Sequence, residues 1–450
     1  MAAYSNVTWT STKYHDGFTE GFARALKRSG NEVLIFHLNG LLAEQFSNKP
    51  KDKFDGMLIK ETIANFDPDL IITFNNSMPC EDIAEITDCP IAIYSADTPA
   101  LYADKERIKK YIDRYYFLNG SRIIAGDVEE RFSPSSDRMI FFGHATDMRA
   151  ADLEQINNIT YIGSMPNHSY AFINFFEQLN LMEPDDNKKN QVKNAFFRAL
   201  DDIGQNEFTK DFDFDFSKYY SSEMENFAEF SALCLYSCKN KFEILSRLTD
   251  LGLKIHGFPW SWPYAMQFNF DLFRHFDYRL SVSIDQNSIN FNSSKISLNM
   301  PNATQKEGLS WRVTDILATN SVLLTKKSDT LAEMFRGYVE LPTYESAAEA
   351  RDLAIQLLNE PSWRRDLSAA SQQMINDKCR FEHKFKLIQE ATGVKLLGGR
   401  EGHLIEFDES AVIRHILVQE PSNTDDPIVH ADPFPRSQGI FARIKRLMSK

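Results

Sequence analysis

The first 165 positions alternate between short runs of consecutive apolar residues and longer segments in which apolar residues return every three or four positions. A continuous apolar run indicates a strand buried on both faces, and the three-to-four spacing indicates an amphipathic helix. The apolar runs are VLIFHL (33–38), LIITFN (70–75), PIAIYSAD (90–97), RYYFLNG (114–120), RMIFFG (138–143) and ITYIGS (159–164). With a further short strand expected at 7–9, this alternation predicts a parallel sheet covered by helices, which is an α/β fold.

The same alternation returns from residue 241, after a polar and helical stretch at 166–240. Strands are expected at LKIHG (253–257), KISLNM (295–300), SVLLT (321–325) and YVEL (338–341), and helices near 346–358, 361–376 and 381–392. A chain of 450 residues is too long for one ordinary hydrophobic core. We therefore predict two Rossmann-like domains that face each other across a cleft, at 1–165 and 166–400.

The last fifty residues differ from the rest of the chain. Positions 401–435 hold eight acidic residues and four prolines, which predicts a weakly ordered segment. Positions 436–450 hold five basic residues and no acid, and a helix there would gather its apolar residues on one side. This pattern predicts a helix that lies on an anionic membrane surface. The alternative is a terminal helix that docks on the protein's own acidic body.

Composition narrows the classes of function. The net charge of -13 argues against a broad nucleic-acid interface, which requires a basic surface. No run of eighteen apolar residues and no signal-peptide pattern is present, and the five cysteines are scattered, so we expect a cytoplasmic protein without a disulfide framework. Cys234 and Cys238 could share a helix face near His256, but buried thiols are favoured there over a metal site.

The densest cluster of candidate polar residues lies at 293–325. A strand that ends at Asn299, a polar loop, and a helix that starts near Gly308 would place unpaired backbone N–H groups toward an anion. Lys295 and Arg312 could add full positive charge for a diphosphate. Each also has a simpler interpretation, Lys295 as a solvated side chain and Arg312 as one half of a surface pair with Asp315.

Two carboxylates and a glycine complete the predicted donor site. Glu307 sits just before the helix and Asp315 two turns inside it, and a carboxylate there could accept the hydroxyls of a ribose. Gly257 ends a strand at an expected cleft edge. The aromatic segment FPWSWPY (258–264) follows it, and Trp260 and Trp262 are either stacking platforms for a base or sugar, or core residues.

The run NSSKISLNM…GLSWRVTDILATNSVLLT, followed by LAEMFRGYVELPTY, resembles the C-terminal domain of the CgeB-like (spore-maturation-protein-like) glycosyltransferases. The resemblance covers 235–392 well and reaches the first half loosely, through PIAIYSADTP and YIGS. It implies a GT-B fold with a nucleotide-sugar donor held by the second domain. It also implies that Glu307 and Asp315 stand at the two ends of a Glu-x7-Glu motif, with Asp replacing the second Glu.

The first domain is expected to bind the acceptor and to supply a catalytic base. His15 and Asp16 lie in the loop before the first helix, and Asp97 ends a strand, so any of them could deprotonate an acceptor hydroxyl. Helix capping by Asp16 and a turn before Pro99 at Asp97 are the structural alternatives.

The sequence thus predicts a glycosyltransferase that moves a sugar from a nucleotide-sugar to a glycan, lipid-linked or protein acceptor. We expect no metal, because the Asp-Phe alternation at 211–216 lacks the context of a metal site. A binding module without catalysis and a GT-B-like sugar-nucleotide epimerase are the alternatives. Whether the reaction inverts or retains the anomeric configuration is left open.

Overall fold

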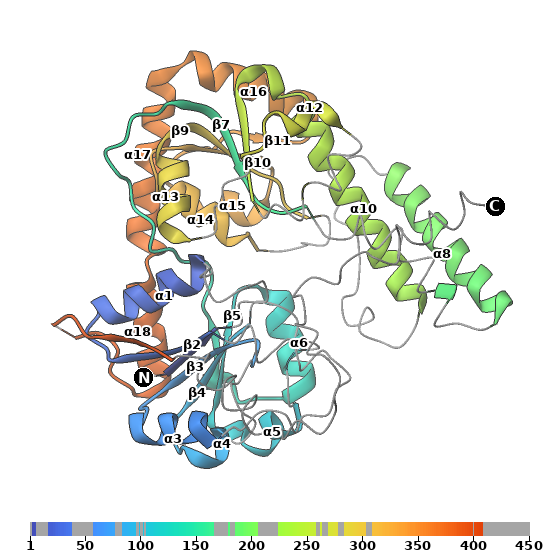
Figure 1. Ribbon diagram of the computed structural model, residues 1–450. Helices are drawn as coiled ribbons and strands as arrows, with labels where there is room; N and C mark the ends of the chain where they lie inside the picture. The colour runs from blue at the N-terminus through green and yellow to red at the C-terminus, as the bar shows by residue number, and fades with distance from the viewer. Residues whose placement is uncertain are drawn as a thin grey trace, which may run out of the picture.

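The computed structural model contains two parallel β-sheets, each covered by helices (Figure 1). The described residues are 2–5, 17–37, 57–76, 83–95, 99, 102, 105–165, 179–180, 185–205, 224–257, 262, 269–277, 283–302, 308–398 and 400–407.

The first sheet has seven strands in the order β12-β2-β1-β3-β4-β5-β6, and every pairing in it is parallel. Its strands are β1 (Ala2–Ser5), β2 (Val33–His37), β3 (Ile71–Phe74), β4 (Ile91–Ser95), β5 (Tyr115–Asn119), β6 (Met139–Phe141) and β12 (Leu404–Glu406). Its helices are α1 (Gly17–Arg28), α3 (Met57–Phe66), α4 (Ile83–Ile86), α5 (Lys105–Lys110), α6 (Arg122–Phe132) and α18 (Phe381–Thr392). Strands β3 and β4 are buried along their whole length, which explains their continuous apolar sequence.

The second sheet has five parallel strands in the order β11-β10-β9-β7-β8. They are β7 (Asn157–Ile162), β8 (Leu253–His256), β9 (Ser294–Asn299), β10 (Val322–Lys326) and β11 (Thr343–Tyr344). Helices α13 (Ile284–Asn292), α14 (Trp311–Leu317), α15 (Asp329–Met334), α16 (Ala347–Asn359) and α17 (Pro361–Lys378) pack around it, with α12 (Phe270–Phe273) beside β8. With the strands numbered along the chain, this is the doubly wound order 2-1-3-4-5. In such sheets the ligand crevice lies at the carboxyl ends of the two neighbouring strands where the strand order reverses, here β7 and β9.

Helices α8 (Asp186–Gln205) and α10 (Met224–Ser246) lie side by side, as predicted for a helical stretch before the second half (Figure 1). The end of α10 carries Ile244 and Leu245 into the core of the second domain. Among the described residues, no helix has both the length and the apolar character needed to cross a bilayer.

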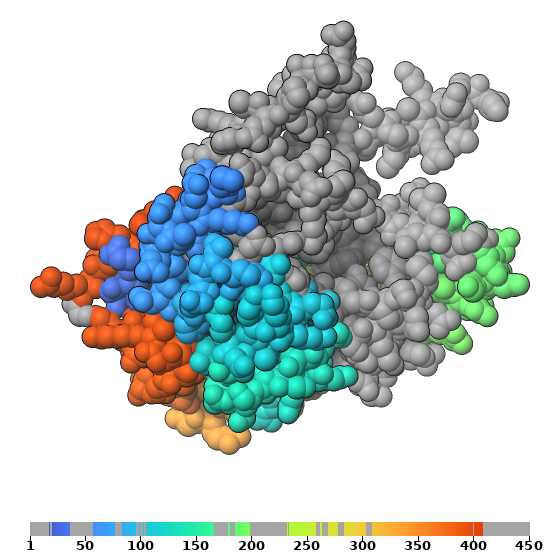
Figure 2. Space-filling model, turned by 90° about the horizontal axis from the view of Figure 1, so that it is seen from below, coloured from blue at the N-terminus to red at the C-terminus, as the bar shows by residue number. Residues whose placement is uncertain are grey.

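The structure corrects the predicted domain boundaries. The run at 159–164 was placed in the first domain, but β7 pairs with β8 and β9 in the second sheet. At the other end the chain returns to the first domain, because Phe381 and Phe385 of α18 pack in its core and β12 pairs with β2. Figure 2 shows this returning segment in orange-red beside the blue start of the chain. Buried parallel strands of both sheets have the same continuous apolar sequence pattern, so this pattern alone does not show which sheet a strand joins.

Three smaller expectations are also changed. The first strand is Ala2–Ser5, while the predicted 7–9 lies outside the described residues. The predicted strand at 338–341 is wrong, since the strand of that region is the two-residue β11. The predicted weakly ordered segment begins with strand β12, and the rest of the tail from 408 lies outside the described residues.

Candidate functional site

A cavity of about 910 Å³ lies between the two domains. Its walls come from the carboxyl ends of β5 and β6 in the first domain, the carboxyl ends of β9 and β10 in the second, and from α10, α15 and α18. Ligands of open α/β sheets bind beyond the carboxyl ends of the strands. The volume is within the range of cofactor and substrate sites in proteins.

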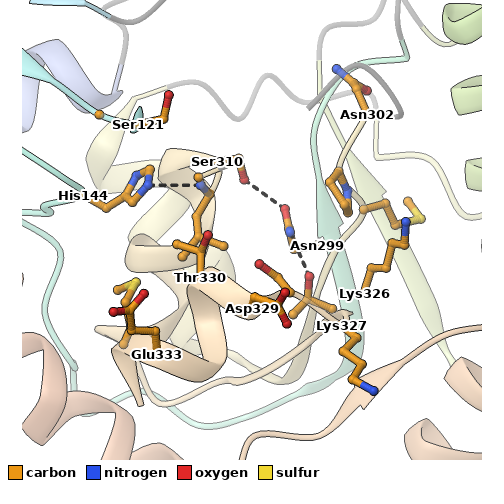
Figure 3. Close-up of a pocket in the computed structure, with 18 of the residues that line it drawn as sticks. Ser121, His144, Asn299, Asn302, Ser310, Lys326, Lys327, Asp329, Thr330 and Glu333 are labelled. Atoms are coloured by element: carbon orange, nitrogen blue, oxygen red, sulfur yellow. Dashed lines mark hydrogen bonds between the residues drawn. The ribbon is translucent and has the colours of Figure 1, made fainter. Parts of the chain in front are cut away.

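Asn299, the last residue of β9, organises one wall of the cavity. Its side-chain N–H donates to Thr325 Oγ1 over 2.9 Å, and its Oδ1 accepts from Ser310 Oγ over 3.0 Å and from Arg312 Nη1 over 3.2 Å. Tyr344 donates its hydroxyl hydrogen to the Asn299 carbonyl over 3.1 Å. Figure 3 shows the first two bonds. This buried amide therefore joins β9, β10 and the start of α14, and fixes the rim of the cavity.

The cavity is cationic, although the whole chain is acidic. Among the residues that the structure describes, six basic side chains line it against three acidic ones. The basic residues are Arg122, Lys241, Lys326, Lys327, Lys378 and Lys384, and the acidic ones are Asp329, Glu333 and Glu345. Lys327 pairs locally with Glu345 over 3.0 Å. A cleft lined mainly by one sign of charge attracts ligands of the opposite sign, so the cavity favours an anion.

Lys241 carries the most enclosed of these positive charges. It lies on α10 and is buried, and its Nζ donates to Asn302 Oδ1 over 2.8 Å and to the Ser164 carbonyl over 3.3 Å. Both partners are neutral oxygens, and neither contact cancels the charge. Among the described residues its hydrogen-bond partners are neutral, and a buried ammonium held in this way favours an anionic ligand beside it.

His144 links the two domains inside the cavity. The backbone N–H of Leu309 donates to His144 Nε2 over 3.0 Å, as Figure 3 shows. Burial, together with the nearby Lys384 ammonium, lowers the pKa of His144 to about 4. The ring is therefore neutral at pH 7, with Nε2 as acceptor and the proton on Nδ1.

The structure brings Asn299 and Gly308 of the predicted donor site onto the cavity wall, but it places Lys295 elsewhere. Lys295 is the second residue of β9, and its Nζ donates to Asn158 Oδ1 over 2.8 Å at the amino end of the sheet. Four residues of strand separate it from Asn299 by about 13 Å. The prediction that Lys295 binds the donor is therefore wrong. Two residues that are close in sequence lie at opposite ends of an extended strand, and only Asn299 lies at the end that faces the cavity.

Arg312 lies next to the cavity without lining it. Besides Asn299, its guanidinium contacts the ring of Tyr161, whose centroid is 5.5 Å away. Asp315 points to another part of the interface, where Thr146 donates its hydroxyl hydrogen to Asp315 Oδ1 over 2.5 Å. Asp315 thus contacts the segment that joins the two domains. It does not line the cavity, where the sequence analysis expected it to bind a ribose.

Gly257 serves packing and does not line the cavity. A Cβ there would lie 2.1 Å from the Gly163 carbonyl oxygen, so only glycine fits this contact between β8 and β7. Trp262 is a core residue: it is fully buried and donates its Nε1 hydrogen to the same carbonyl over 2.9 Å. Trp260 lies outside the described residues.

Four predicted residues cannot be located in space. Glu307, His15, Asp16 and Asp97 all fall outside the described ranges, so their assignments stay predictions. The thiols of Cys234 and Cys238 are buried, and burial raises the pKa of Cys238 to about 11. Within the part of the chain that the structure describes, no group of three His, Cys, Asp or Glu side chains could hold a metal ion.

Several cavity residues were missed by the sequence analysis. Arg122 could have been found, because Gly120 and Ser121 follow strand β5 and precede a helix, the same strand–loop–helix pattern that singled out 293–325. Lys241 and Lys384 carry no such signal. They lie within helices and reach the cavity only through the tertiary fold.

Comparison with known proteins gives one family match. Residues 240–390, about a third of the chain, match a family model described as "Glycosyl transferase-like". This segment runs from the end of α10 through most of α18 and includes Lys241, Asn299 and Lys384. No curated protein matches the chain.

Three solved structures are similar in fold at low identity. A glycosyltransferase from Rickettsia africae shares 10% identity, with 87% of this chain and 97% of that chain covered and a TM-score of 0.47. HepE of Anabaena, solved with UDP and glucose, shares 9%, covers 87% and 98%, and has a TM-score of 0.44. Sucrose-phosphate synthase of Thermosynechococcus elongatus shares 9%, covers 86% and 97%, and has a TM-score of 0.48. At these values none of them identifies a donor or an acceptor.

The fold class expected from the sequence is confirmed by the molecule itself. It contains two Rossmann-like domains with parallel sheets, and their carboxyl ends meet at one cavity. This is the GT-B arrangement.

Proposed function

We propose that this protein is a glycosyltransferase that moves a sugar from a nucleotide-sugar donor to a glycan, lipid-linked or protein acceptor. The observation that carries the proposal is the cationic cavity between the carboxyl ends of two Rossmann-like sheets. The match of residues 240–390 to a glycosyltransferase-like family model supports it. The resemblance of the second half to the CgeB-like enzymes supports placement in that subfamily.

The donor half of the cavity is assigned to the second domain. Lys241, with Asn302 beside it, is placed to meet the diphosphate. The carboxylates of Asp329 and Glu333 on α15 line the same half and can accept hydroxyl hydrogens from a ribose or the transferred sugar (Figure 3). They replace Asp315 in that role, because Asp315 is bonded to Thr146.

In the reaction, the bond between the anomeric carbon and the diphosphate oxygen breaks, and a bond from that carbon to an acceptor oxygen forms. The acceptor's proton passes to a base, for which Asp97, His15 and Asp16 remain our candidates. Negative charge grows on the leaving diphosphate, so a fixed ammonium beside it lowers the barrier. Lys241 supplies that charge, and we propose that the reaction needs no divalent ion.

A panel of nucleotide-sugars, incubated with the full-length chain with and without sugar acceptors, tests the proposal. We expect donor consumption that depends on acceptor and persists in EDTA. Binding without turnover would favour a binding module, and conversion of the donor to an epimer without acceptor would favour an epimerase. Either result would overturn the transferase assignment.

A further inference from the structure

Lys384, on α18, is a half-buried cation in the first domain's wall of the cavity. Its Nζ lies 3.3 Å from the position that a Cβ on Gly143 would occupy, two residues after the end of β6. Among the described residues it makes no ion pair and donates no hydrogen bond, and burial lowers its pKa. The nearest acid on its helix, Glu382, is engaged by Arg28 over 2.6 Å. The ammonium is thus partly desolvated, and no acid among the described residues pairs with it.

An exposed aromatic ring stands next to this charge. Phe141, at the end of β6, is 63% exposed and lines the cavity, and its ring edge lies 3.7 Å from the same Cβ position on Gly143. The absence of a side chain at Gly143 leaves the space between ring and ammonium open. A ring that is exposed inside a cavity is available to stack on the apolar face of a sugar ring.

The rest of this wall is also positive. Arg122 is the first residue of the eleven-residue helix α6, which begins at the N-cap Ser121, so the positive end of the helix dipole adds to its charge. All three carboxylates that line the cavity belong to α15 or to the residue after β11, on the second domain's side. The wall formed by Arg122, Phe141, Gly143 and Lys384 is here called the acceptor wall. It carries positive charge, and none of the described acidic residues lines it.

We propose that the acceptor wall binds an acceptor with an anionic group, a phosphate or a carboxylate, attached to a sugar ring that covers Phe141. Lys384 contacts the anionic group, and Arg122 and the start of α6 strengthen the attraction. The donor's diphosphate is held separately, by Lys241 on the opposite side. The acceptor role rests on the proposed function, whereas the anion site itself does not.

Calorimetry on the full-length chain tests this assignment with three probes: glucose, glucose 6-phosphate and glucuronate. Each is titrated with and without a saturating nucleoside diphosphate. We expect at least one anionic probe to bind about tenfold or more tightly than glucose, as for a charged hydrogen bond. If glucose 6-phosphate binds more tightly than glucuronate, the acceptor's anionic group is a phosphate. If glucuronate binds more tightly, it is a carboxylate. Phe141→Ala should weaken binding of that anionic probe.

Two variants of the same helix make the test specific. Lys384→Met should remove the preference for the anionic probe and leave nucleoside diphosphate affinity within about twofold. Lys386→Met, an exposed lysine of α18 outside the cavity, should change neither. Equal binding of all three probes, or an unchanged preference in folded Lys384→Met, overturns the proposal. So does a loss of nucleoside diphosphate binding in that variant, which would assign Lys384 to the donor. Failure of every nucleoside diphosphate to bind would instead count against the proposed function.

Discussion

Replacing Lys241 by methionine removes one buried positive charge and keeps an apolar stem of similar length. In the free protein the variant loses two hydrogen bonds, to Asn302 Oδ1 and to the Ser164 carbonyl. Both acceptors are neutral and lie near the cavity, where water can replace the lysine, so we expect a folded protein. We expect the larger effect on binding, because the variant lacks the ammonium that we propose to hold the diphosphate.

The size of that effect follows from the interaction that is lost. A hydrogen bond to a charged group contributes about 1.5–3 kcal/mol. At 25 °C this corresponds to a dissociation constant for the nucleoside diphosphate that rises roughly 10- to 150-fold. Lys239→Met is the matched control, since Lys239 lies on the same helix, is exposed and does not line the cavity.

Calorimetric titration with UDP, GDP and ADP measures the change directly. The nucleoside diphosphate that binds best to the natural chain is then titrated into both variants. Circular dichroism confirms that each variant is folded. If folded Lys241→Met binds the nucleotide as tightly as the natural chain does, Lys241 does not hold the diphosphate and the donor assignment fails.

Four further outcomes are expected. Asn299→Ala breaks three side-chain bonds, one buried and two partly buried, and should lower the free energy of unfolding by about 2–4 kcal/mol in urea denaturation; a change below about 0.5 kcal/mol would refute its bracing role. The pKa of His144 is lowered in the folded state to about 4, so its contribution to stability is complete above the unfolded value near 6.5 and is lost as the pH falls toward 4. His144→Gln should flatten the fall in melting temperature over that range, and an unchanged pH profile would contradict the neutral ring. Asp97→Asn or His15→Ala should slow transfer by about 10²–10⁴ at unchanged donor affinity if that residue is the base, and normal turnover in both would place the base elsewhere. The chain truncated after Pro435 should lose binding to anionic vesicles in sedimentation, whereas equal binding of both chains would exclude a membrane role for the tail.

Local patterns were sufficient to predict most of the strands and one loop of the cavity wall. The apolar run of β9, ending at Asn299, and the glycine at 308 led to one wall of the cavity, because a strand, a polar loop and a helix are continuous in sequence. The same reasoning failed for Lys295. It is close to Asn299 in sequence, but the strand carries it to the opposite end of the sheet.

The other wall depends on contacts that no local pattern contains. His144 and Leu309 are 165 positions apart and meet only because both domains are folded. Lys384 reaches the cavity because α18 crosses back to the first domain, and amphipathic spacing in a helix does not say which sheet it covers. The strand at 157–162 was recognised by its composition but assigned to the wrong sheet for the same reason.

A structure of the full-length chain with its preferred nucleoside diphosphate tests the central claim most directly. We expect the diphosphate inside the cavity, with an oxygen within hydrogen-bond distance of Lys241 Nζ and the Lys384 ammonium left free for the acceptor. A nucleotide bound outside the cavity, or a diphosphate held by Lys384 and not by Lys241, would contradict the account.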